Sequence, residues 1–199
     1  MGSPLNQGLV SKQTGANLIQ TGGEFGERLM TELNPRYYEW AYRGNVFNAV
    51  TQAVITFTAG LTTASGLVFG IQNAPSSNKN VVLLNASFAL TGTTLSVIGL
   101  SVGPVTSTLN TATTTGPTIQ GALNATSTGG SVCRVVSVVA SPVVVQILGG
   151  MSAASAAVVA TNYVELAGSI IVGPGATVCM VASAAQTAWG SLTWVELPI

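Results

Sequence analysis

The segments Asn80–Leu90 (NVVLLNASFAL) and Thr93–Val102 (TTLSVIGLSV) decide the fold class of this chain. Both are rich in β-branched and large apolar residues, which favour strands. Side chains at alternate positions of a strand point to one face. In the first segment we therefore expect one face to line a core, formed by Val82, Leu84, Ala86, Phe88 and Leu90.

The same pattern extends through residues 46–199. Ala53, Ile55 and Phe57 alternate with Gln52 and Thr56, as in a strand with one buried face. Gly, Pro and Asn clusters separate the apolar runs and mark turns. Further strands are predicted at Asn45–Thr58, Ser65–Asn73, Ser131–Ala140, Val143–Leu148, Tyr163–Val172, Ala176–Ser183 and Ala188–Glu196.

Many short strands with Gly and Pro turns predict an all-β fold, an antiparallel β-sandwich. At eight or nine strands, the favoured topology is jelly-roll-like. The Ser- and Thr-rich section Thr106–Thr128 is predicted as a long connection or a projecting loop. The Ala-rich section Met151–Thr161 fits a short helix or another loop.

Charged residues are unusually scarce. They make up 6% of the chain, against roughly 25% in a typical soluble domain. Six basic and six acidic residues give a formal net charge of zero, and such a surface is poorly protected against association. We favour a surface covered by partner subunits over a neutral surface coated with Ser and Thr. Without clustered cations, no direct nucleic-acid partner is expected.

Charge also divides the chain into two parts. Residues 1–45 hold eight of the twelve charged residues. The remaining four, in residues 46–199, are Lys79, Arg134, Glu165 and Glu196. We therefore predict an N-terminal arm, residues 1–45, and a β-sandwich body, residues 46–199. The arm begins with the polar stretch Met1–Gly22, which offers no core of its own.

A short helix is predicted within the arm, at about residues 23–34 (GEFGERLMTELN). Phe25, Leu29 and Leu33 recur at the spacing that places them on one helical face. Pro35 ends the helix, because the residue before a proline avoids the α region. A helix of this length is marginal alone, so its apolar face must dock, either on its own body or on a neighbour.

The run Arg36–Arg43 (RYYEWAYR) follows and holds four of the twelve aromatic residues. In an extended chain Tyr38, Trp40 and Tyr42 would point to one side. Tyr, Trp and Arg dominate protein interfaces. Two interpretations stay open, an interface and an aromatic lid over one end of the sandwich. Candidate assembly residues from the arm are Phe25, Leu29, Leu33, Arg36, Tyr37, Tyr38, Trp40, Tyr42 and Arg43.

The residues needed for common catalytic and metal sites are missing. The chain contains no His and no Asp, which excludes Ser-His-Asp and Cys-His sites within it. Zinc lacks its usual ligand set and calcium its Asp-rich loop. For a carboxylate pair, the body offers only Glu165 and Glu196. We expect no enzyme, no cofactor and no metal.

Neither a secretion signal nor a membrane span is expected. Met1–Val10 has no cationic region followed by an apolar stretch. The most apolar stretch, Val132–Leu148, is interrupted by polar residues and rich in Val, so we predict two strands there instead of a membrane helix. Cys133 and Cys179 both lie in predicted strands, and free thiols are favoured over a disulfide.

Motifs at both ends of the chain resemble small virion proteins of tailed bacteriophages. The first are Tyr37-Tyr38-Glu39 and Tyr42-Arg43-Gly44-Asn45-Val46-Phe47. The second are Gly173-Pro174-Gly175 and Trp189-Gly190-Ser191-Leu192-Thr193-Trp194-Val195-Glu196-Leu197-Pro198. The resemblance implies a jelly-roll decoration, or cement, protein. It would form a homotrimer at the three-fold positions of an icosahedral head and bind the major capsid protein, on the virion surface, after synthesis in the bacterial host cytoplasm.

Two other functions remain as alternatives. One is a host-recognition module of a head fibre or tail that binds glycans through Thr106–Thr128. The other is a single jelly-roll coat protein. A coat that packs a genome usually carries a basic arm, whereas the first 22 residues here contain one cation, Lys12.

Overall fold

The computed structural model describes residues 9–10, 17–18, 37–57, 59–61, 67–104, 118–121, 132–137, 143–151 and 160–199. The chain divides into two units, Met1–Tyr38 and Glu39–Ile199. In the first unit, β1 (Leu9–Val10) pairs antiparallel with β2 (Asn17–Leu18). The helix predicted at 23–34, with Phe25, Leu29 and Leu33, lies outside the described residues, and so does Arg36.

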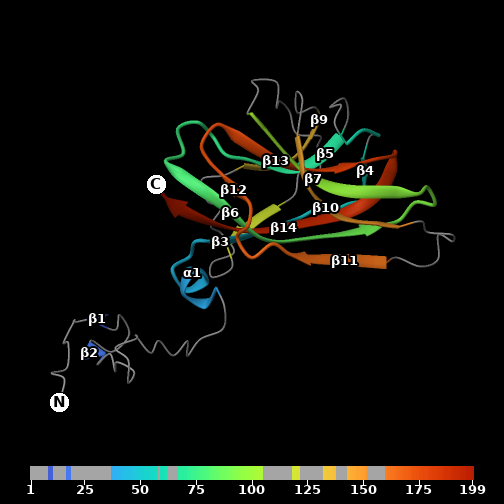
Figure 1. Ribbon diagram of the computed structural model, residues 1–199. Helices are drawn as coiled ribbons and strands as arrows, with labels where there is room; N and C mark the ends of the chain where they lie inside the picture. The colour runs from blue at the N-terminus through green and yellow to red at the C-terminus, as the bar shows by residue number, and fades with distance from the viewer. Residues whose placement is uncertain are drawn as a thin grey trace, which may run out of the picture. The chain divides into compact units, whose positions relative to one another are not determined.

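The second unit is built from two antiparallel sheets (Figure 1). The seven-stranded sheet has the order β11 (Ala160–Glu165), β6 (Lys79–Leu90), β14 (Gln186–Pro198), β3 (Val46–Val50) and β8 (Thr118–Gly121), with β12 (Ile171–Val172) on β6 and β4 (Ile55–Phe57) on β14. The five-stranded sheet has the order β10 (Val143–Met151), β7 (Ser96–Pro104), β13 (Ala176–Ala182), β5 (Leu67–Gln72) and β9 (Val132–Ser137). The predicted all-β sandwich is confirmed at this level.

Strand pairing is nested along the chain. β3 pairs with β14, β5 with β13, β6 with β11 and β7 with β10. Two further pairings, β14 with β6 and β13 with β7, join these pairs into the two sheets. β8 and β9 come from the connection between β7 and β10, and they extend the sheets beyond β3 and β5.

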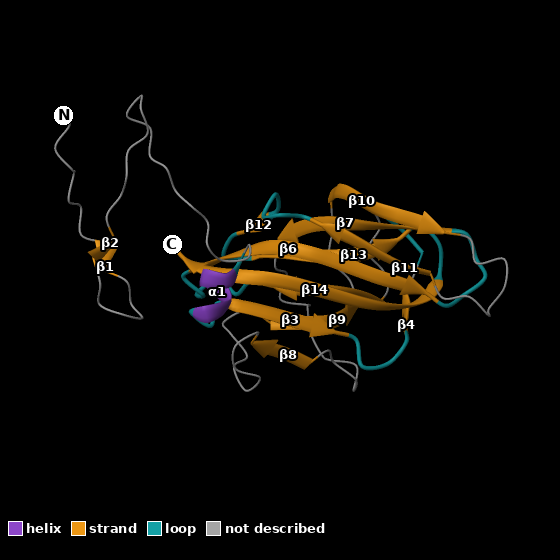
Figure 2. Ribbon diagram, turned by 90° about the horizontal axis from the view of Figure 1, so that it is seen from below, coloured by secondary structure: helices purple, strands orange, loops and turns teal. Residues whose placement is uncertain are grey.

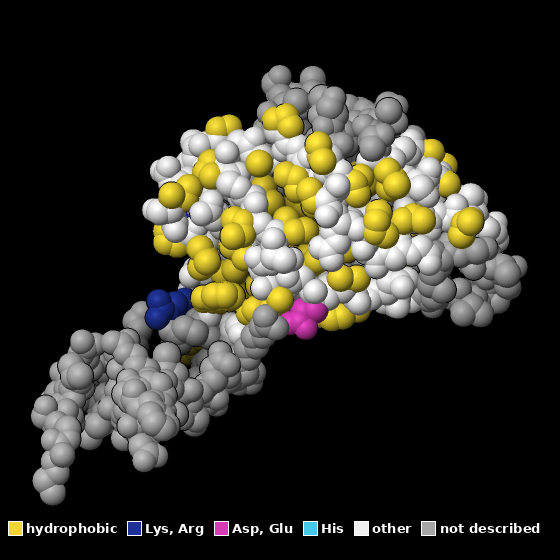
Figure 3. All heavy atoms as spheres, viewed as in Figure 1, with side chains coloured by type: hydrophobic (Ala, Val, Ile, Leu, Met, Phe, Trp, Pro, Cys, Tyr) yellow, Lys and Arg dark blue, Asp and Glu magenta, His cyan; other side chains and the backbone are white. Residues whose placement is uncertain are grey.

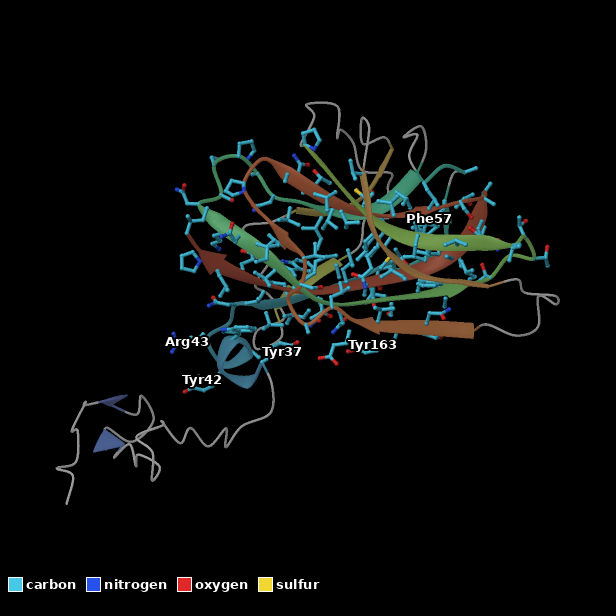
Figure 4. The ribbon with its side chains drawn as sticks, in the orientation of Figure 1. Tyr37, Tyr42, Arg43, Phe57 and Tyr163 are labelled. Atoms are coloured by element: carbon cyan, nitrogen blue, oxygen red, sulfur yellow. The ribbon has the colours of Figure 1, made fainter. Side chains whose placement is uncertain are left out.

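The core lies between the two sheets and is aromatic at its centre. Trp194, Phe57, Phe69 and Phe88 are fully buried, and Figure 4 shows Phe57 between the layers. The Phe47 and Trp194 rings, on neighbouring strands, stack with their centroids 6.0 Å apart. As predicted, Ile55 and Phe57 are buried while Gln52 and Thr56 are exposed.

A β-bulge interrupts the alternation predicted for Asn80–Leu90. Asn85 lies opposite Thr193, but Leu83 lies opposite Trp194, so Leu84 is an extra residue in β6. Ala86, Phe88 and Leu90 line the core as predicted, and beyond the bulge the core side passes to Val81 and Leu83. Val82 and Leu84 are buried too, but they are not part of the main core cluster.

Three predicted segments differ in the structure. Asn45–Thr58 splits into β3 and β4, and Tyr163–Val172 splits into β11 and β12. The second break is a turn at Ala167 and Gly168, both with positive φ. The section Thr106–Thr128 is not wholly a projecting loop, because β8 within it pairs with β3. Residues 152–159 of the Ala-rich section lie outside the described ranges.

Candidate functional site

The aromatic run 36–43 is partly helical, so the predicted extended conformation is wrong. α1 (Tyr38–Tyr42) is a five-residue helix. It ends where the Gly44 amide donates to the Ala41 carbonyl at 2.9 Å and Gly44 adopts a φ of 75°. In a helix, positions two apart point to nearly opposite sides. Trp40 is accordingly half-buried, while Tyr42 and Arg43 are exposed, as Figure 4 shows for the latter two.

α1 lies beside one end of the outer face of the seven-stranded sheet (Figures 1 and 2). At this end Val46, Val195 and Val82 are opposite one another across three strands. All three are buried, although they lie outside the main core cluster. A half-buried Trp40 agrees with the lid interpretation, whereas the exposed Tyr42 and Arg43 agree with an interface.

Further along the same outer face lie two exposed aromatic side chains. Tyr163 is 64% exposed and Trp189 is 38% exposed. Tyr163 lies opposite Ser87, which lies opposite Ser191, and Trp189 lies opposite Ala89. Figure 4 shows Tyr163 on the side of β11 that faces away from the other sheet. We call this surface the aromatic face, and it comprises Tyr163, Trp189, Val50, Asn48, Ser87, Ala89, Ser191 and Thr193.

Hydrogen bonds between strands order the polar side chains of the aromatic face. The hydroxyl oxygens of Ser87 and Ser191 are 2.6 Å apart. The Thr193 hydroxyl donates to Asn48 Oδ1 at 2.8 Å. Beyond Trp189, the Thr91 hydroxyl donates to that of Thr187, also at 2.8 Å. Such cross-strand pairs each stabilise the sheet by roughly 0.2–1 kcal/mol.

A second exposed surface is apolar and lies on an edge strand. Val143, Val145 and Ile147 of β10 are 66%, 50% and 53% exposed. We call these three residues the β10 strip. β10 pairs only with β7 in the described part of its sheet, and its register shifts twice along that pairing. Such bulges discourage strand pairing with another chain. A partner would therefore contact the side chains of the β10 strip and not its backbone.

Charges contribute little to either surface. Figure 3 shows the basic and acidic side chains mostly at the lower margin of the body, among apolar and uncharged polar atoms. Lys79 and Glu196 form an ion pair with an N–O distance of 2.9 Å. The buried Glu196 carboxylate also accepts a hydrogen bond from Trp194 Nε1 at 3.4 Å, so this pair joins the ends of β6 and β14.

The described residues hold no cluster of metal ligands, and their described thiol is buried. Among them there is no group of three or more Cys, Asp, Glu or His side chains that could hold a metal ion. Cys179 is a free, buried thiol, and burial raises its pKa to about 12. It is therefore protonated and unreactive at neutral pH. The prediction of a free thiol is confirmed for Cys179, and the Cys133 side chain lies outside the described residues.

The candidate residues predicted from the arm are only partly described. Tyr37 has a positive φ of 69° and precedes α1, which begins at Tyr38. Trp40, Tyr42 and Arg43 are grouped by α1 and the turn after it. The aromatic face and the β10 strip were not predicted. The sequence did hold a signal for the outward position of Trp189. Ala188, Gly190 and Leu192 are the buried side of β14, so Trp189, between two of them, points to the outer side.

No family model, curated protein or solved structure matches this chain. In the part of the chain that the structure describes, no helix has the length and apolar character required to cross a membrane.

Proposed function

We propose that this protein is a virion structural protein, a decoration protein that binds and stabilises the icosahedral head of a tailed phage. It would act through its surfaces, as a homotrimer bound to the major capsid protein, and not as an enzyme. The β10 strip carries this proposal. Three large aliphatic side chains lie exposed on one edge strand, β10, of a body whose sequence holds four charged residues.

The strip is suited to contact between subunits. Fully burying side chains of this size gains roughly 1.5–3 kcal/mol each, and the cores of subunit interfaces are apolar and poor in charge. An exposed apolar patch on a soluble protein typically marks an interaction site. We therefore assign the β10 strip to contacts between copies of this chain.

Strand pairing supports the finer fold that the resemblance implies. If the short strands β4 and β12 and the inserted β8 and β9 are set aside, the first strand of the body pairs with the last, the second with the last but one, and so on inward: β3 with β14, β5 with β13, β6 with β11 and β7 with β10. A long hairpin rolled up in this manner is a jelly roll, an architecture common in viral capsids and lectins. We infer a jelly roll with one inserted pair, β8 and β9.

The capsid contact would come from the arm. Tyr42, the last residue of α1, and Arg43 after it are exposed, and both are residue types favoured at interface centres. The apolar helical face predicted for Phe25, Leu29 and Leu33 would dock on a capsid subunit. An arm contact and a separate subunit contact would let one trimer bridge several capsid subunits.

Oligomeric state tests the proposal. In sedimentation equilibrium we expect the full chain to form a trimer, three times its 20.1 kDa mass. Replacing Val143, Val145 and Ile147 together by Ser should give a folded monomer. The matched control replaces three aliphatic residues exposed elsewhere, Leu95, Ile171 and Ile199, by Ser and should remain trimeric. A wild-type chain that is monomeric at high concentration would contradict the proposal.

Location on the particle tests the virion role. A reconstruction of the virus that encodes the chain should show sandwich density in threes on the outside of the head. Deletion of residues 1–36, which leaves α1, Tyr42 and Arg43 in place, should keep the trimer and weaken head binding. Density at a fibre or tail would favour the host-recognition alternative. Closed shells formed by the purified chain alone would favour the coat protein.

A further inference from the structure

We propose that the aromatic face of the seven-stranded sheet binds a neutral oligosaccharide between Tyr163 and Trp189. This function goes beyond the proposed role in assembly. It also uses a different sheet from the one that carries the β10 strip.

The two aromatic side chains are placed as the ends of an elongated site. Tyr163 lies on β11 and Trp189 on β14, with β6 between them, and they are offset by two residues in register. Strand spacing and rise per residue put their Cα atoms ~12 Å apart, a span of two to three sugar rings. The intervening positions on β6 are Ser87 and Ala89, whose small side chains leave the space between the aromatic rings open.

Aromatic rings exposed on a flat sheet suit the apolar C–H faces of sugar rings. Trp and Tyr combine a large apolar surface with a polar group at the edge. The side chains of Tyr163 and Trp189 are 64% and 38% exposed to water when no ligand is bound. Val50, opposite Ser191, adds an exposed aliphatic side chain beside the site.

The polar side chains between the aromatic rings suit sugar hydroxyl groups. Each sugar hydroxyl both donates and accepts, so it needs partners that can do the same. The Ser87–Ser191 pair shares one hydrogen, which leaves a second hydroxyl hydrogen and further lone pairs on these two groups. The bond from Thr193 uses Asn48 Oδ1 and does not use the Asn48 amide hydrogens. Held by cross-strand bonds, these groups need little reordering to bind.

Charge selects a neutral ligand. The residues that define the aromatic face carry no charge. The charged residue on this side of β11 is Glu165, two residues from Tyr163 and in the cross-strand row of Asn85, Thr193 and Asn48. A sulfated, phosphorylated or sialylated glycan would find no cation among these residues and would meet this carboxylate at the margin. A protein partner fits less well, because interface cores are apolar, whereas hydrogen-bonded hydroxyl and amide groups occupy the middle of this face.

A glycan array probed with the labelled full chain tests the inference. We expect binding to one or more neutral glycans, followed by titration calorimetry with the best of them. Tyr163→Ala and Trp189→Ala should each weaken binding by about tenfold, the loss of one aromatic contact. Trp189→Phe should restore most of the affinity. Tyr42→Ala removes an exposed tyrosine outside the aromatic face and should bind as the wild type does.

Three results would overturn the inference. They are binding to no neutral glycan, binding to charged glycans alone, and binding that survives both alanine variants. The aromatic face would instead be a subunit contact if the wild type binds no glycan and the Trp189→Ala substitution dissociates the oligomer. Because the Tyr163 side chain is largely exposed, we expect Tyr163→Ala to fold normally. If Trp189→Ala fails to fold, Tyr163→Ala still tests the inference. Failure here leaves the β10 strip experiment unaffected.

Discussion

Replacing Gly70 by Ala tests the pairing of β5 with β13, one of the four nested pairs. Gly70 lies directly opposite Cys179. A Cβ at this position would overlap the Val178 carbonyl oxygen and lie 2.5 Å from Cys179 Sγ and 2.9 Å from Cys179 Cα. Two of these three atoms belong to the backbone of the neighbouring strand, so a rotamer change cannot relieve the overlap. The two strands must separate in the middle of the five-stranded sheet.

We expect Gly70→Ala to lower the free energy of unfolding by about 2.5 kcal/mol. Overpacking typically costs 1–3 kcal/mol, and here the upper end applies because backbone must move. The gain of 0.4–1 kcal/mol from the stiffer unfolded chain offsets only part of this cost. For a chain of this size the loss corresponds to a melting temperature about 7 °C lower.

Urea-induced unfolding followed by circular dichroism measures the change. The matched control is Gly173→Ala, where the nearest atom to an added Cβ is Asn80 Oδ1 at an ordinary 3.8 Å. We expect this control to be neutral or slightly stabilising. If Gly70→Ala proves as stable as the wild type, then Gly70 does not lie against Cys179. The nested pairing, and the jelly roll inferred from it, would fall with that result.

Three further predictions concern the buried groups Glu196 and Cys179. Lys79→Met should lower the free energy of unfolding in urea by about 2 kcal/mol, because it removes the cation beside the buried Glu196 carboxylate. Breaking a fully buried ion pair costs roughly 3–5 kcal/mol. The loss should be smaller here, because the Lys79 side chain is 41% exposed. Lys79→Arg should lose little, and an equal loss in both variants would contradict a role for the charge. Burial raises the pKa of the Cys179 thiol from 9.0 to about 12. At pH 8 we therefore expect iodoacetamide to modify Cys179 in the unfolded protein but not in the native protein. Peptide mass spectrometry measures this modification. The unfolded chain releases this proton first, so the wild type should lose more stability than Cys179→Ala as the pH rises from 9.0 towards 12; equal losses would count against a buried thiol.

Local pattern predicted much of the secondary structure. Period-two alternation and turn residues located most of the strands to within a few residues, because a half-buried strand must alternate and a tight turn needs Gly, Pro or Asn. The same alternation in β14 left Trp189 on the outer side. Alternation failed at Leu84, where a bulge inserts one residue, since a bulge arises from pairing with β14 and not from β6 alone.

Conformations that depend on distant contacts were not predictable. Tyr38–Tyr42 has the composition of a strand but forms a helix, and strand or helix for so short a segment is decided by its surroundings. β8 lies in a Ser- and Thr-rich section that has no apolar alternation, and it is a strand because the edge of β3 offers it backbone partners.

Composition and local sequence pattern determined that this chain has few charges, lacks His and Asp, and forms β structure. These properties belong to each residue or to its immediate neighbours in the sequence. Only the tertiary structure decided which strands pair, and hence that Tyr163 and Trp189 share one face while Val143, Val145 and Ile147 lie on an edge. The physical reason is that a strand's hydrogen bonds are made with another strand, whose identity and register its own residues do not specify.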